Sequence, residues 1–206
     1  MAENNKRMVA FNIKNAKYAL KKDEGYDTPV AFGYSDSLAL QADYSEKIIY
    51  GDGMKIATIP NDKGKTGTLT LLTVDDAYEV AMKRRLATAN GMAEIKQLAS
   101  IEHAIYYEFE YMENDGDTRT AKVWMYGVTS GRPSESLSQT TEDINNNNVD
   151  YALTIRGTLL MDSAGTAQYT DASGNHVVVW QVMALPEDAG YGTFGDTCPI
   201  PKASAV

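Results

Sequence analysis

The stretch that decides the fold is VDYALTIRGTL, residues 149–159. Its apolar and polar residues alternate along the chain. Val149, Tyr151, Leu153, Ile155 and Leu159 fall on one face, whereas Asp150, Thr154, Arg156 and Thr158 fall on the other. A period of two is typical of a β-strand that buries one face in an antiparallel sheet. The stretch therefore predicts a mainly β protein.

Neighbouring stretches extend this prediction. Residues 105–111 alternate in the same way and place Glu108 and Glu110 on the outward face. The Asp-Gly pair within residues 114–117 favours a tight hairpin turn, after which residues 121–126 return as a strand. Further strands are predicted over residues 9–13, 37–42, 54–59, 66–72 and 177–182. Together they indicate an antiparallel β-sandwich or barrel.

One segment has helical rather than strand periodicity. Residues 73–86 begin at Thr73, a good N-cap, and carry acids in the first turn and bases in the last turn, as the helix dipole favours. Their apolar stripe, predicted to pack on the sheet, comprises Val74, Ala77, Tyr78, Ala81, Met82 and Leu86. A weaker helix or coil is expected over residues 91–99.

The organisation predicted is one domain, residues 1–185, followed by an irregular tail, residues 186–206, rich in Gly, Pro and Ala. Residues 44–65 are interpreted as a long loop between two strands. Loops of that length in compact domains usually have a function or lack order. Residues 143–148 form a second, polar loop.

Composition narrows the function classes. The 206 residues are 43% hydrophobic and 23% charged, which is typical of a globular protein. No apolar run is long enough to span a membrane, and residues 1–14 lack a signal-peptide pattern, so folding in a cytosol is expected. The single cysteine, Cys198, cannot form an intrachain disulfide. A net charge of −9 argues against stable binding of nucleic acid. It does not argue against a protein past which DNA moves without being bound.

Residues 64–66, Gly-Lys-Thr, end like a phosphate-binding loop. That loop requires a glycine five positions earlier, where this chain has Ile59, and it must lead into a helix. Here the chain continues into an alternating Thr/Leu run, which predicts a strand. We therefore expect no nucleotide at this stretch and no other cofactor.

Candidate catalytic residues are few. His103 and His176 lie at or beside predicted strand ends without the partners of a zinc site, and are interpreted as surface or half-buried polar residues. Glu108 and Glu110 share a strand face, which is more typical of a solvated face than of a glycosidase pair. We expect no catalytic, metal or cofactor site, and hence no enzyme.

The order of these blocks resembles the major tail tube protein of long-tailed, siphovirus-type bacteriophages, the type common in phages of Gram-positive hosts. The resemblance covers roughly residues 9–160 and is carried by YGDGMKIAT (residues 50–58) and YGVTSGRPS (residues 126–134), on either side of the predicted helix. It implies a β-sandwich with a flanking helix, assembled into stacked hexameric rings that form a non-contractile tail tube.

The resemblance also implies partners, location and site residues. The partners would be copies of this chain, the tape measure, terminator and distal tail proteins, and phage DNA passing through the lumen without specific binding; no membrane is involved. The location would be the virion tail, assembled in the host cytoplasm. The subunit or ring interface would include Glu46, Lys47, Ile48, Ile49, Tyr50, Asp52, Lys63 and Lys65, and the lumen-facing acids would be Glu108, Glu110 and Asp150.

Two alternatives remain open from the sequence. The 13 tyrosines and two tryptophans suit a soluble carbohydrate-binding β-sandwich module, because aromatic rings provide platforms for sugars. The other alternative is an enzyme of an unrecognised type.

Overall fold

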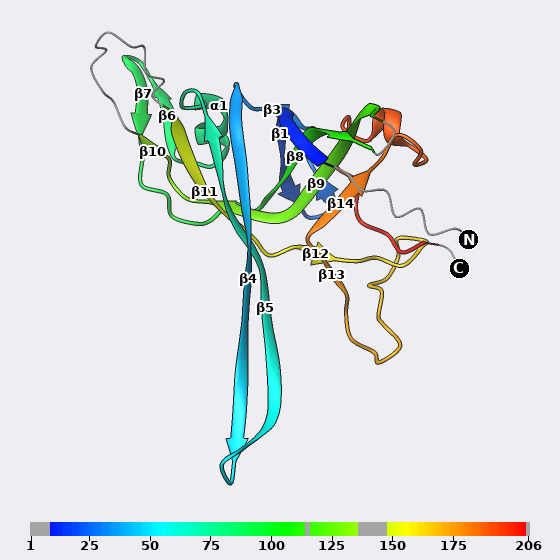
Figure 1. Ribbon diagram of the computed structural model, residues 1–206. Helices are drawn as coiled ribbons and strands as arrows, with labels where there is room; N and C mark the ends of the chain where they lie inside the picture. Colours follow the sequence, from blue (N-terminus) through cyan, green and yellow to red (C-terminus); the bar gives the residue numbers. More distant parts are fainter. Residues whose placement is uncertain (1–8, 114–115, 136–147, 205–206) are drawn as a thin grey trace.

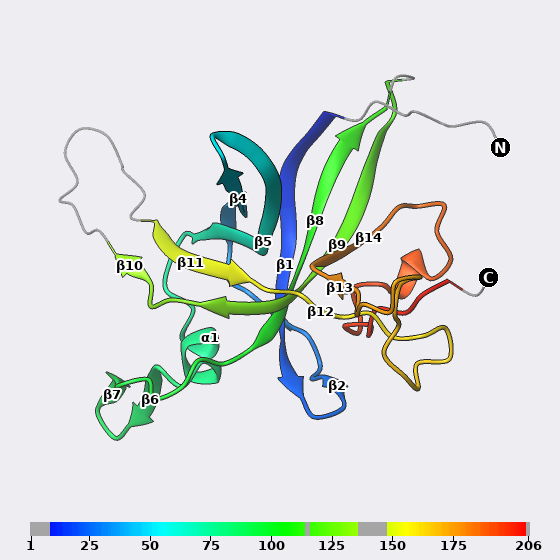
Figure 2. The same ribbon diagram turned by 90° about the horizontal axis from the view of Figure 1, so that it is seen from below.

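The computed structural model describes residues 9–113, 116–135 and 148–204. A ten-stranded antiparallel sheet dominates it, in the order β2-β1-β8-β9-β11-β5-β4, with β3, β10 and β14 joined at the side. The described residues contain one α-helix, α1, at one flank of the sheet (Figure 1). The prediction of a mainly β chain with a single flanking helix is confirmed. The sheet curls (Figure 2), but its end strands do not close it into a barrel.

The elements in chain order are β1 (Val9–Lys22), β2 (Gly25–Tyr26), β3 (Val30–Ala31), β4 (Ser35–Gly51), β5 (Met54–Leu71), α1 (Asp76–Ala81), β6 (Arg85–Thr88), β7 (Gly91–Glu94), β8 (His103–Met112), β9 (Thr118–Ser130), β10 (Ser134–Glu135), β11 (Val149–Ile155), β12 (Thr158–Leu159), β13 (Val178–Val179), β14 (Gln181–Ala184) and the 3-10 helix η1 (Tyr191–Thr193).

The main core lies between α1 and one face of the curled sheet. The predicted inward face of β11 is confirmed for Val149, Tyr151, Leu153 and Ile155, which are buried while Asp150 and Ala152 are exposed. The pattern stops at Ile155 because the chain turns at Gly157, which has φ +79° and lies close to the carbonyl of Val179. Leu159 therefore belongs to β12, which pairs with β13 and not with the main sheet.

A second, smaller core covers the opposite face of β1, β8 and β9. It contains Ala19, Ala104, Tyr106, Trp124 and Tyr126. Residues 187–204 pack over it without helices or strands apart from η1. Trp124 Nε1 donates to the Phe194 carbonyl at 2.8 Å, and Lys17 Nζ donates to the Gly195 carbonyl at 2.9 Å. Cys198 is half-buried against the same cluster.

The helix is shorter than predicted. It begins after Asp75, whose carboxylate caps the Tyr78 amide at 2.9 Å, rather than after Thr73. It ends at Ala81, and Lys83 takes a left-handed φ of +55°. Residues 85–88 then form β6, which pairs with β7, so the helix or coil expected over residues 91–99 begins instead as a strand. The predicted apolar stripe is also wrong at Ala77 and Leu86, which are exposed.

Residues 44–65 are not a loop. They are the distal parts of β4 and β5, which pair from Ser35 opposite Leu71 to Gly51 opposite Met54, with register shifts after Ser35, Ala42 and Ile49. Asp52 and Gly53, both with positive φ, form the turn at the tip. The ribbon extends far from the body of the domain (Figure 1).

Two other strand predictions have mixed outcomes. The β8–β9 hairpin is confirmed, with Met112 opposite Thr118, although residues 114–115 of its turn lie outside the described residues. The strand predicted over residues 177–182 is interrupted at Trp180: β13 pairs with β12, whereas β14 pairs with β9. Residues 143–147 of the predicted polar loop also lie outside the described residues.

Candidate assembly surface

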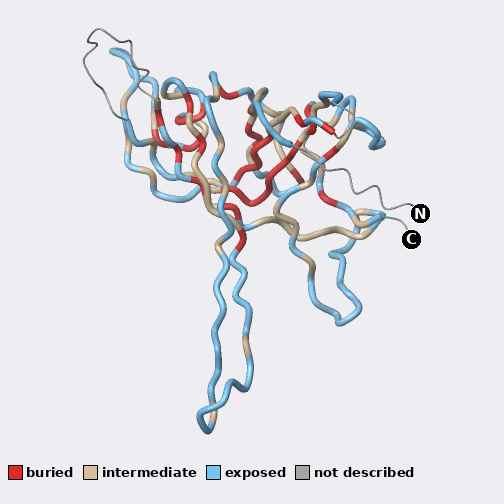
Figure 3. Tube along the Cα trace, viewed as in Figure 1, coloured by how far each residue is buried: buried red, intermediate tan, exposed pale blue. Residues whose placement is uncertain are grey.

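The distal half of the β4–β5 ribbon, residues 44–62, is named here the projecting hairpin. Figure 3 shows it exposed along almost its whole length. Its large apolar side chains have exposed fractions between 38% for Ile49 and 71% for Met54. They are Tyr44, Ile48, Ile49, Tyr50, Met54, Ile56 and Ile59. Many large apolar side chains exposed on one projecting ribbon mark a contact site.

The strand register divides the projecting hairpin into two faces. Residues directly opposite each other in an antiparallel pair share a face. The Lys47 face comprises Ser45, Lys47, Ile49, Ala57, Ile59 and Asn61, and the Glu46 face comprises Tyr44, Glu46, Ile48, Thr58, Pro60 and Asp62. Consistent with this division, the Tyr44 hydroxyl donates to Glu46 Oε1 at 2.6 Å, and this hydrogen bond raises the pKa of Tyr44.

The base of the hairpin is fixed to the domain. Arg156 pairs with Asp43 at 3.0 Å and also donates to the Lys63 carbonyl. Gly64, at φ +100°, approaches β11 so closely that a Cβ would lie 2.2 Å from the Ile155 carbonyl oxygen. Any other residue at position 64 would push the two strands apart, so this glycine allows β5 to continue past β11 into the projection.

The predicted interface residues separate into two groups. Glu46, Lys47, Ile48, Ile49, Tyr50 and Asp52 lie together on the projecting hairpin, whereas Lys63 and Lys65 lie at its base. Lys65 Nζ donates to Gln181 Oε1 of its own chain at 2.8 Å. Residues 64–66 lie within β5, so the strand predicted to follow the Gly-Lys-Thr stretch is confirmed.

The three acids predicted to face the lumen do not form one unpaired patch. Glu110 accepts from Asn12 and Lys14, each at 2.9 Å, and these bonds lower the pKa of Glu110. Glu108 accepts from Tyr106 at 2.6 Å and from Asn15 at 2.7 Å. Asp150 lies two strands away on β11, where it accepts from Thr70 at 2.7 Å.

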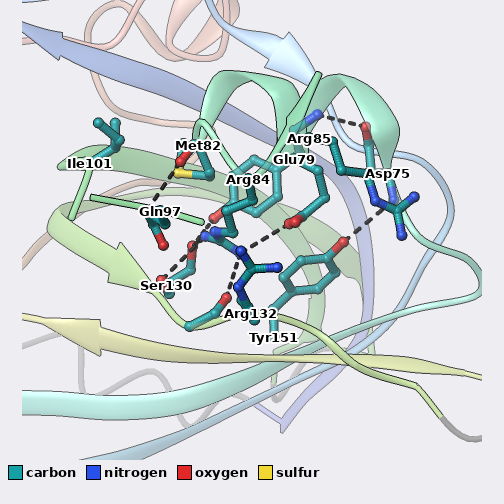
Figure 4. Close-up of polar contacts among 12 residues, drawn as sticks. Asp75, Glu79, Met82, Arg84, Arg85, Gln97, Ile101, Ser130, Arg132 and Tyr151 are labelled. Atoms are coloured by element: carbon teal, nitrogen blue, oxygen red, sulfur yellow. Dashed lines mark hydrogen bonds and ion pairs between the residues drawn. The ribbon is translucent and has the colours of Figure 1, made fainter. Parts of the chain in front are cut away.

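A buried ion pair lies beneath α1 (Figure 4). Arg84 and Glu79 have side chains that are 0% and 2% exposed, with Nη1 and Oε1 3.0 Å apart. Arg84 also donates to the carbonyls of Ser130 and Gly131 at the end of β9. The sequence did not predict this pair, because the predicted helix placed residues 83–85 in its last turn, where the dipole alone favours cations. Residues five apart are not neighbours on a helix, so helical spacing gave no signal.

His103 is fully buried, so the expectation of a surface or half-buried residue is wrong. Its Nδ1 lies 3.1 Å from the Ile101 carbonyl, which can only accept, so Nδ1 carries the proton. Its Nε2 lies 2.9 Å from the Tyr78 hydroxyl, which is also 2.7 Å from Ser130 Oγ. Burial, with a smaller contribution from the charge on Arg84, lowers the pKa of His103 to about 4.

Acid should therefore destabilise the protein through His103. The ring stays neutral in the folded state down to about pH 4, whereas in the unfolded chain it binds a proton below about pH 6.5. The neutral ring therefore contributes fully to the free energy of unfolding above pH 6.5. As the pH falls toward 4, on the order of 3 kcal/mol of that free energy is lost. Urea unfolding of the wild type and of His103→Gln across this range tests the prediction, because the variant should depend less on pH. Equal slopes would contradict it.

Comparisons with known proteins identify no family for this chain. No protein-family model matches the chain, and no curated protein matches it significantly. Among solved structures, a chain in the cryo-EM structure of the anti-feeding prophage (AFP) baseplate, 6-fold symmetrised, is similar with 7% identity and a TM-score of 0.37. The match covers 71% of this chain and 89% of that chain. A TM-score of 0.37 is too low to assign a role to this chain.

The described residues contain no group of three or more His, Cys, Asp and Glu side chains placed to hold a metal ion. Within these residues, no helix has the length and apolar character needed to cross a bilayer.

Proposed function

We propose that this chain is a structural virion protein that assembles with copies of itself into stacked hexameric rings. These rings would form the tail tube through which phage DNA is ejected into the host. The proposal rests on the projecting hairpin, whose apolar side chains are exposed to water outside its own domain. That exposure is unfavourable, so we expect another surface to cover the hairpin. The block order, with YGDGMKIAT at the tip of this ribbon, supports the same function.

The hairpin suits repeated assembly for a geometric reason. It points away from its own domain, so the surface that covers it belongs to another molecule (Figure 1). Contacts between two different surfaces of identical subunits repeat head to tail and generate rings or filaments. A projecting hairpin on every subunit therefore supports a tube better than it supports a closed dimer.

The carbohydrate-binding alternative has less support. The aromatic content suggested this alternative, but seven of the 15 tyrosine and tryptophan rings are buried: Tyr18, Tyr78, Tyr106, Tyr111, Trp124, Tyr126 and Tyr151. The exposed tyrosines Tyr34, Tyr44, Tyr50 and Tyr169 do not include a stacked aromatic pair with one another. A sugar platform requires exposed rings, so the aromatic content favours a core role.

Electron microscopy of the purified chain tests the proposed function. At increasing protein concentration, negative-stain images should contain rings and then tubes, and light scattering should rise together with them. A control sample at low concentration should elute as a monomer on size-exclusion chromatography. A chain that remains monodisperse and monomeric at every concentration would contradict self-assembly, and glycan binding by that monomer would support the alternative.

A further inference from the structure

The sheet has an open seam between its first and last strands. β1 and β4 approach each other without pairing. A cavity of about 450 Å³ lies between them and has a mainly apolar lining. The lining used below is named the β1–β4 seam: Phe11 and Ile13 of β1, Asp36, Leu38 and Leu40 of β4, and Tyr107 and Phe109 of β8. A second cavity of about 460 Å³ continues from it past Ile13.

The strand edges on both sides of the seam are open. Within the described residues, β4 pairs only with β5, so its outer edge has no strand partner. β1 pairs with β2 and β3 only through residues 17–22, and the Phe32 amide donates to the Ala16 carbonyl, which leaves the edge of residues 9–15 open on that side. Open edges beside an apolar floor favour the addition of an extended segment. Phe11, 41% exposed, lies in this opening.

Charge selects which segment fits. Asp36 is the one charged side chain in the lining of the first cavity, and it is exposed. The Lys47 face of the projecting hairpin likewise has one charged residue, Lys47, next to Ile49 and Ile59. The Glu46 face has two acids, Glu46 and Asp62, which would repel Asp36. The Lys47 face therefore matches the seam in both apolar character and sign of charge.

We propose that the β1–β4 seam is the docking site for the projecting hairpin of a second copy of this chain, which enters with its Lys47 face toward the seam. Ile49 and Ile59 cover the apolar floor at Tyr107 and Phe109, and Lys47 pairs with Asp36. The seam of one copy receives the hairpin of another, and each copy offers both surfaces. This inference rests on the proposed self-assembly and adds the surface that receives the hairpin.

Charge reversal across the contact tests the docking. Lys47→Asp and Asp36→Lys should each raise the protein concentration needed for assembly by about tenfold, because each places like charges together. The double variant restores the pair in reversed order and should assemble near the wild-type concentration. Glu46→Lys is the matched control: it lies on the opposite hairpin face, so its effect should be independent of Asp36→Lys. Thermal melts of every variant verify that the domain is folded.

Cross-linking provides a second readout. In a Cys198→Ser background, Phe11→Cys combined with Ile59→Cys should form disulfide-linked chains during assembly, whereas Phe11→Cys with Thr58→Cys, on the other hairpin face, should form few. If the wild type does not assemble at all, the proposed function fails. If it assembles, but the double charge variant is not restored or the Phe11 and Ile59 cysteines do not link, the seam is not the receiving surface even though self-assembly stands.

Discussion

Replacing residues 46–60 with an Asn-Gly turn should give a folded monomer that forms no tubes. Ser45 and Asn61 are opposite each other in the β4–β5 ladder, so a two-residue turn can join them. The change removes Ile48, Ile49, Tyr50, Met54, Ile56 and Ile59, which supply most of the exposed apolar surface of the projection. If assembly depends on this surface, the shortened chain should not assemble.

The domain itself should tolerate the replacement. None of the removed residues belongs to either buried core cluster, and the base remains fixed by Arg156 and Asp43. The melting temperature should change by less than about 4 °C, which corresponds to about 1 kcal/mol for a chain of this size. Light scattering and negative-stain imaging beside a thermal melt provide the measurement.

Two outcomes would overturn this expectation in different ways. Long tubes from the shortened chain would show that the hairpin is not the assembly element. Loss of the cooperative melt would show that the projection supports the fold. The matched control is Asp52→Asn at the tip, which keeps the length, the turn and the apolar residues, and should assemble like the wild type.

The contrast between β11 and the hairpin shows what the sequence could predict. In β11 one face meets the core and the other meets solvent, so burial imposes a period of two on residues 149–155. The projecting hairpin buries neither face within its own domain. Consecutive apolar residues such as Ile48 and Ile49 therefore occupy both faces, and the pattern resembles a loop. The strand predicted over residues 54–59 lies within β5, but the interpretation of residues 44–65 as a loop was wrong, and this failure is informative, because a ribbon without a buried face in its own chain is suited to contact with another.

The predicted extent of the helix was wrong for a different reason. Residues 73–86 satisfy the usual rules for caps and terminal charges, but those rules describe an isolated helix. In the fold, Arg84 bonds to the carbonyls of Ser130 and Gly131, which are distant in sequence, and the chain leaves the helix at Lys83 to place it there. Tertiary contacts of this kind have no local signature.

Arg84→Met should destabilise the domain by about 3–5 kcal/mol, because it leaves the Glu79 carboxylate buried without its cation. Arg85→Met is the matched control. Arg85 also forms ion pairs, with Asp76 at 2.6 Å, Glu94 at 3.1 Å and Glu135 at 3.5 Å, but Asp76 and Glu94 are more than half exposed and Glu135 is 38% exposed. Exposed pairs contribute little, so this variant should lose about 1 kcal/mol or less. Chemical unfolding of the two variants at neutral pH gives the comparison, and equal losses would contradict the special role of the buried pair.

The loss in Arg84→Met should also depend on pH in a predictable direction. Burial already raises the pKa of Glu79, and the positive charge of Arg84 opposes that shift, so removing Arg84 raises the pKa further. When the pKa of an acid is higher in the folded state than in the unfolded chain, the folded protein is most stable while that acid is protonated. Its free energy of unfolding then falls as the pH rises through the folded-state pKa. The difference in stability between Arg84→Met and the wild type should thus grow from acid toward neutral pH.

Arg84→Met combined with Glu79→Gln lacks the titrating carboxyl group and should show a smaller loss without this growth. If both variants follow the same pH profile, the carboxylate of Glu79 is not the source of the instability.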